Sequence, residues 1–192
     1  MQAIQINRLT RRQRPGFLAA LRATPFRRLG RCQRAITAVE FALVAPVFIA
    51  TVIASLQTAV IFFAQENLQT AVNESARLIM TGQAQKQGMT AGQFQSNLCT
   101  HLISMFNCSG VYVNTQTFTS FSTISMTNPV QNNNFQSSGL TYSPGGPGDI
   151  VVVQGFYQWP VVFAPLAFYL SNVGGNKRLL TATAAFRNEP YI

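Results

Sequence analysis

The longest apolar stretch of this 192-residue chain runs from Phe41 to Ala64 and contains no charged residue. Two carboxylates flank it, Glu40 immediately before it and Glu66 just after it. As a helix, residues 41–65 would be about 37 Å long, which exceeds the roughly 30 Å hydrocarbon core of a bilayer. The pattern predicts a helix that crosses a membrane once.

After residue 65 the pattern becomes amphipathic, and nothing there ends the helix. Leu68, Val72, Ala76 and Ile79 recur at spacings of four, four and three, with polar side chains between them. Gly82 is suited to the end of a helix. We therefore predict one helix over residues 37–81, apolar all round in its first half and amphipathic in its second half.

The rest of the chain predicts a small α+β domain. A second helix is expected at 90–105, where Phe94, Leu98 and Leu102 recur every four residues. Strands are expected at 111–118, 149–159 and 179–187, with 119–126 as a further candidate, a long surface loop at 127–148 and a short helix at 163–170. An antiparallel sheet of three or four strands would bury its apolar face on the amphipathic half of the long helix.

Charge separates the N-terminal segment from the remainder. Residues 1–35 carry nine of the 14 basic residues and none of the five acids, so the remainder holds five of each. A basic tail could bind nucleic acid, but basic residues beside an apolar span are typical of its cytoplasmic side. We predict a cytoplasmic leader at 1–35, a transmembrane helix at 36–64 and an exported domain at 65–192 that includes the helix continuation 65–81, with no nucleic-acid partner.

The leader leaves one other location open. Its arginine-rich, acid-free composition is also that of a mitochondrial transit peptide, which would make this a mitochondrial inner-membrane protein. A secretory signal peptide is disfavoured, because its apolar region is about 7–15 residues long.

The cysteines are divided by the predicted span. Cys32 lies on the leader side, whereas Cys99 and Cys108 both lie beyond the span. Two thiols in an exported domain are expected to pair, and the odd one stays in the reducing compartment. We predict a Cys99–Cys108 disulfide; the alternative is two unpaired, small core residues.

Candidate chemistry for catalysis is sparse. The chain has one histidine, His101, and one aspartate, Asp149, so neither a histidine-based metal site nor an aspartyl dyad can be assembled. We predict no enzymatic activity, no catalytic or metal-ligating residues and no cofactor. Gln57, a polar residue inside the span, is expected to find its hydrogen-bond partner on another helix.

The residues around Glu40 resemble a known family. Residues 35–46, Ala-Ile-Thr-Ala-Val-Glu-Phe-Ala-Leu-Val-Ala-Pro, are similar to the N-terminal signature of TadE-like minor pilins, or pseudopilins, of the tight-adherence (Flp-type) branch of type IV pili. Residues 148–151, 159–160 and 180–191 are similar to later parts of the same family.

The resemblance implies a processing step. A membrane-embedded prepilin peptidase would cut between Ala35 and Ile36, where Ala35 stands in place of the usual glycine, and Glu40 would become the fifth residue of the product. The cut removes the arginine-rich leader and creates an α-amine at Ile36. Glu40 would pair with such an amine, in its own chain or in a neighbouring pilin; the alternative is an interfacial acid that only marks the end of the helix.

The predicted function is therefore pilus assembly: a minor pilin that primes, caps or regulates an adhesive Flp-type pilus. The resemblance implies a single-pass protein of the bacterial inner membrane, with a cytoplasmic N-terminus and a periplasmic domain. Its implied partners are the prepilin peptidase, other major and minor pilins, and the pilus assembly platform. The alternative is an unprocessed single-span protein whose periplasmic domain binds a ligand or senses the envelope.

Overall fold

The computed structural model of the protein describes residues 33–126, 128–163, 165 and 169–190. The chain divides into two units, residues 1–49 and 50–192. The long helix α2, Gln33–Met80, belongs to the first unit up to residue 49 and to the second unit beyond it. Residues 1–32 of the predicted leader, 1–35, lie outside the described residues. The predicted boundaries at 35/36 and 64/65 concern membrane topology and stay predictions.

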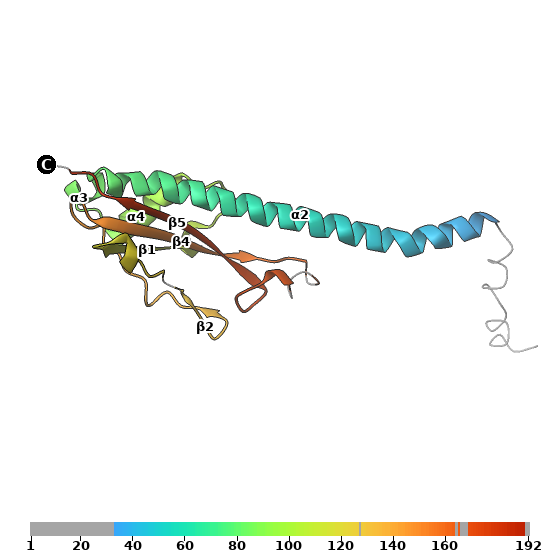
Figure 1. The fold of residues 1–192 in the computed structure, drawn as a ribbon. Coiled ribbons are helices and arrows are strands. Elements are labelled where there is room, and N and C mark those ends of the chain that lie inside the picture. The colour runs from blue at the N-terminus through green and yellow to red at the C-terminus, as the bar shows by residue number, and fades with distance from the viewer. Residues whose placement is uncertain (1–32, 127, 164, 166–168, 191–192) are drawn as a thin grey trace, which may run out of the picture. The chain divides into compact units, whose positions relative to one another are not determined.

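The second unit is an α+β domain, as predicted (Figure 1). A three-stranded antiparallel sheet has the order β1-β4-β5, and a separate hairpin is formed by β2 and β3. Its elements after α2 are α3 Gln83–Lys86, α4 Ala91–Thr100, β1 Val111–Phe118, β2 Val130–Gln131, β3 Asn134–Phe135, β4 Ile150–Pro160 and β5 Lys177–Arg187, with 3-10 turns at Cys108–Gly110 and Phe121–Thr123.

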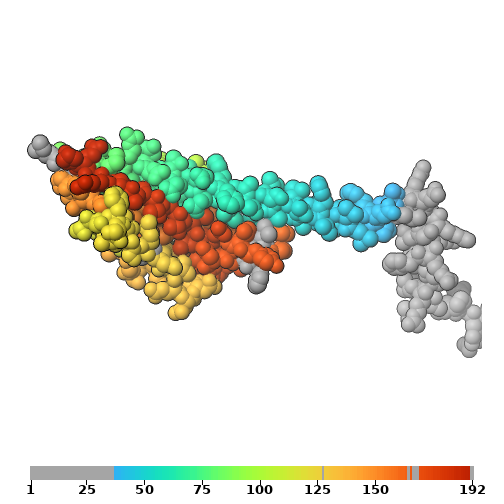
Figure 2. Space-filling model, viewed as in Figure 1, coloured from blue at the N-terminus to red at the C-terminus, as the bar shows by residue number. Residues whose placement is uncertain are grey.

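The amphipathic half of α2 packs on the sheet as its pattern predicted. Leu68, Val72 and Ile79 are fully buried, and they share one core cluster with Val151 and Val153 of β4. In Figures 1 and 2 this part of α2 (green) lies directly along β5 (red). The helix ends at Met80, and Gly82 follows in the left-handed conformation (φ 75°) that favours glycine.

The central strand β4 approaches α2 most closely at Gly155. A Cβ atom at this position would lie 2.6 Å from Val72 Cγ2, which is closer than side chains pack. Glycine is therefore required here because the helix occupies the space that any side chain would need.

The opposite face of β4 is also covered, which the sequence did not predict. Phe156 is fully buried, and its ring centroid lies 6.1 Å from that of Phe135 in the hairpin. Val130 and Leu140 pack against the same cluster. The segment 127–148, expected to be a plain surface loop, therefore supplies a second, smaller core, because its few apolar residues cover the face of β4 turned away from α2.

Both edges of the sheet are hydrogen-bonded within the domain. On the β5 edge, Gln65 Nε2 donates to Thr181 O (2.8 Å) and Gln69 Nε2 donates to Thr183 O (2.9 Å). On the β1 edge, Thr115 N donates to Thr141 O (2.7 Å), and Ser143 N donates to Thr115 O (2.9 Å). At these positions neither edge has unpaired backbone N–H and C=O groups with which another strand could form a ladder of hydrogen bonds.

The predicted second helix is present, but it ends five residues early. Thr90 and Gln93 form a reciprocal capping box that starts α4. The helix ends at Thr100 because the disulfide between Cys99 and Cys108 requires the chain to reverse direction within nine residues. The apolar residues of 101–106 that extended the pattern pack against the core from a turn instead.

The candidate strand at 119–126 is wrong. Ser120 caps a 3-10 turn there, its side chain accepting a hydrogen bond from Ser122 N (3.3 Å). β1 already pairs with β4 on one side and with residues 141–143 on the other, so no free edge remains for this segment near β1. Of the short helix predicted at 163–170, Pro165, Tyr169 and Leu170 are helical, and residues 164 and 166–168 lie outside the described residues.

Candidate membrane-spanning and assembly segment

The first half of α2 exposes nearly all of its apolar side chains. Phe41, Leu43 and Val47 are each about 70% exposed. The other exposed large apolar residues up to position 56 are Val39, Val44, Phe48, Ile49, Val52, Ile53 and Leu56. A patch of this extent must be covered by lipid or by another protein.

Burial by the protein's own domain begins near residue 61. Ile61 is 5% exposed and Ala64 is fully buried, although both lie inside the predicted span of 36–64. Residues 41–60, between Glu40 and this onset of burial, would form about 30 Å of helix, which equals the thickness of a bilayer's hydrocarbon core. One face of the last turn of the predicted span, with Ile61 and Ala64, is therefore covered by the domain, whereas Phe62 and Phe63 stay exposed.

Glu40 lies at the start of this segment and is exposed. Among the described residues the ion pair formed is Arg77 with Glu74, at 3.9 Å, so Glu40 has no ion-pair partner in that part of the chain. Ala35 and Ile36 lie in the first turn of α2. Ile36 and Glu40 are four residues apart, which places them on the same face of a helix, one turn from each other.

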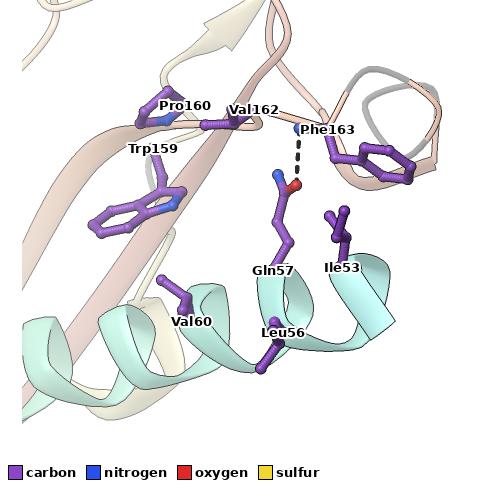
Figure 3. Close-up of a pocket in the computed structure, with 8 residues that line it drawn as sticks. All are labelled: Ile53, Leu56, Gln57, Val60, Trp159, Pro160, Val162 and Phe163. Atoms are coloured by element: carbon purple, nitrogen blue, oxygen red, sulfur yellow. Dashed lines mark hydrogen bonds between the residues drawn. The ribbon is translucent and has the colours of Figure 1, made fainter. Parts of the chain in front are cut away.

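An apolar hollow lies where α2 first meets the sheet (Figure 3). Its volume is about 450 Å³, and its walls come from α2 and from the end of β4 with the residues that follow. The lining residues are Ile53, Leu56, Gln57, Val60, Trp159, Pro160, Val162 and Phe163.

Gln57 joins the two walls of this hollow. Phe163 N donates a hydrogen bond to Gln57 Oε1 (2.8 Å), drawn as the dashed line in Figure 3. Gln57 Nε2 is buried and has no acceptor among the described residues. The expectation that another helix partners Gln57 is wrong for its carbonyl oxygen, because the chain beyond β4 folds back onto α2 and supplies a backbone N–H.

The predicted disulfide is present. Cys99 in α4 and Cys108 in the following 3-10 turn are bonded, with their Cα atoms 5.9 Å apart, a usual separation. The disulfide fastens the turn to α4. Just before this turn, the ring of Phe106 packs against Tyr157, with the ring centroids 4.9 Å apart. Cys32 lies outside the described residues.

The single histidine and the single aspartate of the chain lie at the ends of secondary-structure elements. His101 is exposed and caps the C-terminus of α4. Asp149 accepts a hydrogen bond from Gly146 N (2.7 Å), which stabilises the turn before β4. Over the described residues, no three His, Cys, Asp or Glu side chains form a group that could hold a metal ion.

The segment that carries Glu40 also carries the family signal. Residues 35–77 match the model of the TadE-like protein family. The resemblance seen at residues 35–46 is thereby confirmed, and the TadE-like segment extends through the exposed apolar half of α2 into the half that packs on the sheet. No curated protein and no solved structure matches the chain. The similarities noted at 148–151, 159–160 and 180–191 fall outside the matched residues and stay predictions.

The TadE-like segment contains a candidate membrane span. Thr37–Met80 is long and apolar enough to cross a membrane by length and composition, and it is the one such helix among the described residues. This fits a single-pass membrane protein. The composition of the segment does not set the direction in which it crosses.

Proposed function

We propose that the protein is a minor pilin, or pseudopilin, that takes part in the assembly of a Flp-type pilus by priming, capping or regulating it. The observation that carries this proposal is the TadE-like match, which begins at Ala35 and includes Glu40. The match starts at the residue that would precede the cut, and the first charged residue after the cut is Glu40, which the resemblance makes the fifth residue of the product.

Processing follows from the arrangement of charge. The leader holds nine arginines and no acid, which anchors it on the cytoplasmic side of the inner membrane. A prepilin peptidase that cuts between Ala35 and Ile36 removes all nine. The remaining helix then has no cluster of basic residues before its apolar half, so the largest electrostatic barrier to leaving the bilayer is gone.

After the cut, the carboxylate of Glu40 has a positively charged partner nearby. The new α-amine at Ile36 lies one helical turn away, and its positive charge is attracted to the carboxylate. In a filament core an unpaired carboxylate would be costly, because the surroundings are apolar. Glu40 therefore favours docking against the α-amine of a neighbouring pilin, with the amine of its own chain as the intramolecular alternative.

The exposed apolar half of α2 is needed both in the membrane before assembly and in the assembled filament. Lipid covers these side chains before assembly, and the helices of major and minor pilins cover them in the filament. The α+β domain, held by its own core and by the Cys99–Cys108 disulfide, stays folded on the periplasmic side throughout.

The test compares Glu40→Gln with Glu66→Gln in the cells that assemble the pili. Both changes remove one carboxylate from an exposed position on α2, but Glu66 lies beyond the span. We expect both variants to be inserted and processed, and only Glu40→Gln to lose surface pili. Normal piliation with Glu40→Gln would leave Glu40 as a boundary residue and reject its assembly role.

N-terminal sequencing of the purified protein tests the processing step separately. We expect a mature chain that begins at Ile36. A mature N-terminus at Met1 or Gln2 in piliated cells would reject the processed pilin and favour the unprocessed single-span protein with a periplasmic binding or sensing domain.

A further inference from the structure

One end of the sheet combines exposed apolar residues with exposed basic charge. Val162, just after β4, is 86% exposed, and Lys177 at the start of β5 is exposed as well. We call this the interface edge and define it by Trp159, Pro160, Val162, Phe163, Tyr169 and Lys177. A valine so open to the surroundings, next to an apolar hollow, marks a surface that is covered in the working protein.

The interface edge lies at a defined depth along α2. The hydrogen bond from Phe163 N to Gln57 Oε1 ties it to the helix three residues before Val60. Counted from Glu40 at one membrane surface, a hydrocarbon core of about 30 Å ends near Val60. On the face of α2 that meets the domain, burial begins at Ile61, which is the level at which a span counted from Glu40 ends.

The charge of the interface edge has one sign. From Ile150 to Asn188 the chain contains Lys177, Arg178 and Arg187 and no acid. Arg178 is engaged in the fold, since its Nη1 donates to Leu170 O (3.1 Å). Lys177 is the exposed cation beside the apolar residues, which is the arrangement that an anionic headgroup with its acyl chain would match.

Aromatic residues complete the pattern. Trp159 lines the hollow, and Tyr169 is 79% exposed on the same connection between β4 and β5. Tryptophan and tyrosine are enriched where hydrocarbon meets headgroups, because their rings are apolar and their N–H or O–H groups are polar.

We propose that the interface edge docks on the bilayer that α2 crosses, with Val162 and Phe163 among the acyl chains and Lys177 at anionic headgroups. The domain is then held to the membrane surface by a second contact besides its helix. This inference needs only that α2 spans the membrane, and it stands whether or not the leader is removed or a pilus is formed.

Trp159 is the single tryptophan of the chain; it is 9% exposed and lines the hollow beside Val162, so its fluorescence reports on lipid that enters the hollow. The full-length protein is reconstituted at high dilution in vesicles of phosphatidylcholine, with or without phosphatidylglycerol, that carry brominated lipids. Bromine quenches tryptophan fluorescence on contact. We expect strong quenching by bromines placed just below the headgroups and weaker quenching by bromines at the bilayer centre.

A matched pair of variants tests whether Trp159 is quenched because the interface edge contacts the bilayer, or only because α2 lies in the membrane nearby. Val162→Asp puts a charge into the interface edge, whereas Phe121→Asp makes a similar change at a 59% exposed residue that follows β1. Phe118, the last residue of β1, pairs with Ile150, ten residues or about 33 Å of strand from Pro160. We expect Val162→Asp to reduce the quenching several-fold and Phe121→Asp to leave it unchanged.

Headgroup charge is tested with Lys177→Gln. We expect phosphatidylglycerol to strengthen the quenching of the wild type, and this gain to fall by about fivefold in the variant. Circular dichroism and the intact Cys99–Cys108 disulfide show that each variant is folded, and Val162→Ser provides a milder second change at the same site.

Three results would overturn the proposal. One is a Trp159 that is not quenched by any brominated lipid, and another is equal quenching in the wild type, Val162→Asp and Val162→Ser. The third is a loss of quenching each time more protein is added per lipid, seen in folded samples even at the lowest protein-to-lipid ratios. That result would mean that a second copy of the chain, and not lipid, covers the interface edge.

Discussion

The contact between Gly155 of β4 and Val72 of α2 makes a quantitative prediction about the core. A methyl group added at Gly155 would lie 2.6 Å from Val72 Cγ2, while its next neighbours, Leu68 Cδ1 and Leu98 Cδ1, would be at ordinary distances of 3.8 and 4.0 Å. Overpacking a close-packed core costs about 1–3 kcal/mol. We expect Gly155→Ala to lower the free energy of unfolding by that amount, because the new Cβ atom overlaps Val72 Cγ2.

Val72→Ala removes the atom that causes the conflict. On its own this variant loses two methyl groups at a fully buried position, at a cost of about 1–3 kcal/mol. In the double variant the new methyl group at 155 occupies space that the valine has vacated. The double variant should therefore be more stable, by about 1–2 kcal/mol, than the sum of the two single losses predicts. This is the range of interaction energy expected for residues in direct contact.

The assay is urea unfolding of the full chain in detergent, followed by the fluorescence of Trp159 and by circular dichroism. Gly139→Ala is the control, since a Cβ there meets nothing within 4 Å, and its effect should stay within about 0.5 kcal/mol. If Gly155→Ala is as stable as the wild type, or if the costs of the two single variants simply add, then β4 does not lie against Val72 and the packing described here is wrong.

Three further predictions concern the disulfide, one buried tyrosine and the cleavage site. Replacing Cys99 and Cys108 by serine should cost about 2–3 kcal/mol, because the bond restricts the unfolded chain across a sequence separation of nine; urea curves measure this, and free thiols at both positions in envelope preparations would contradict it. Burial raises the pKa of Tyr142 above 10.0, so its stabilising contribution is complete below pH 10.0 and is lost as pH rises through the higher folded-state value. Tyr142→Phe should remove that alkaline loss without lowering stability at neutral pH, because the hydroxyl is buried with no partner among the described residues; thermal melts in which both proteins decline equally above pH 10 would refute it. Ala35→Leu should leave the precursor uncut on immunoblots, and normal processing would move the predicted cut elsewhere.

The sequence by itself was sufficient for the long elements and for the TadE-like segment. The change in α2 from apolar on all sides to amphipathic is visible in the spacing of Leu68, Val72 and Ile79, and the structure buries all three. The strand expected at 111–118 is β1, and those expected at 149–159 and 179–187 differ from β4 and β5 by one or two residues at their ends. The motif around Glu40 was recognisable because its residues are contiguous.

The disulfide was predictable for a different reason. Topology placed Cys99 and Cys108 on one side of the span and Cys32 on the other, and this division needs no knowledge of the fold. Where α4 ends was not predictable from the same residues, because the apolar spacing continues through Leu102 while the bond to Cys108 turns the chain away after Thr100.

Only the tertiary structure decided the partners of the polar residues on α2. Gln65 and Gln69 look like the solvent side of an amphipathic helix, yet their side chains bond the outer edge of β5, more than 110 residues away. Gln57 looks like a contact for another helix, yet its oxygen accepts from Phe163 N. Hydrophobic periodicity reports which face of an element avoids water. It does not report which distant backbone group meets a polar side chain, because that depends on how helix and sheet are placed against each other once both have formed.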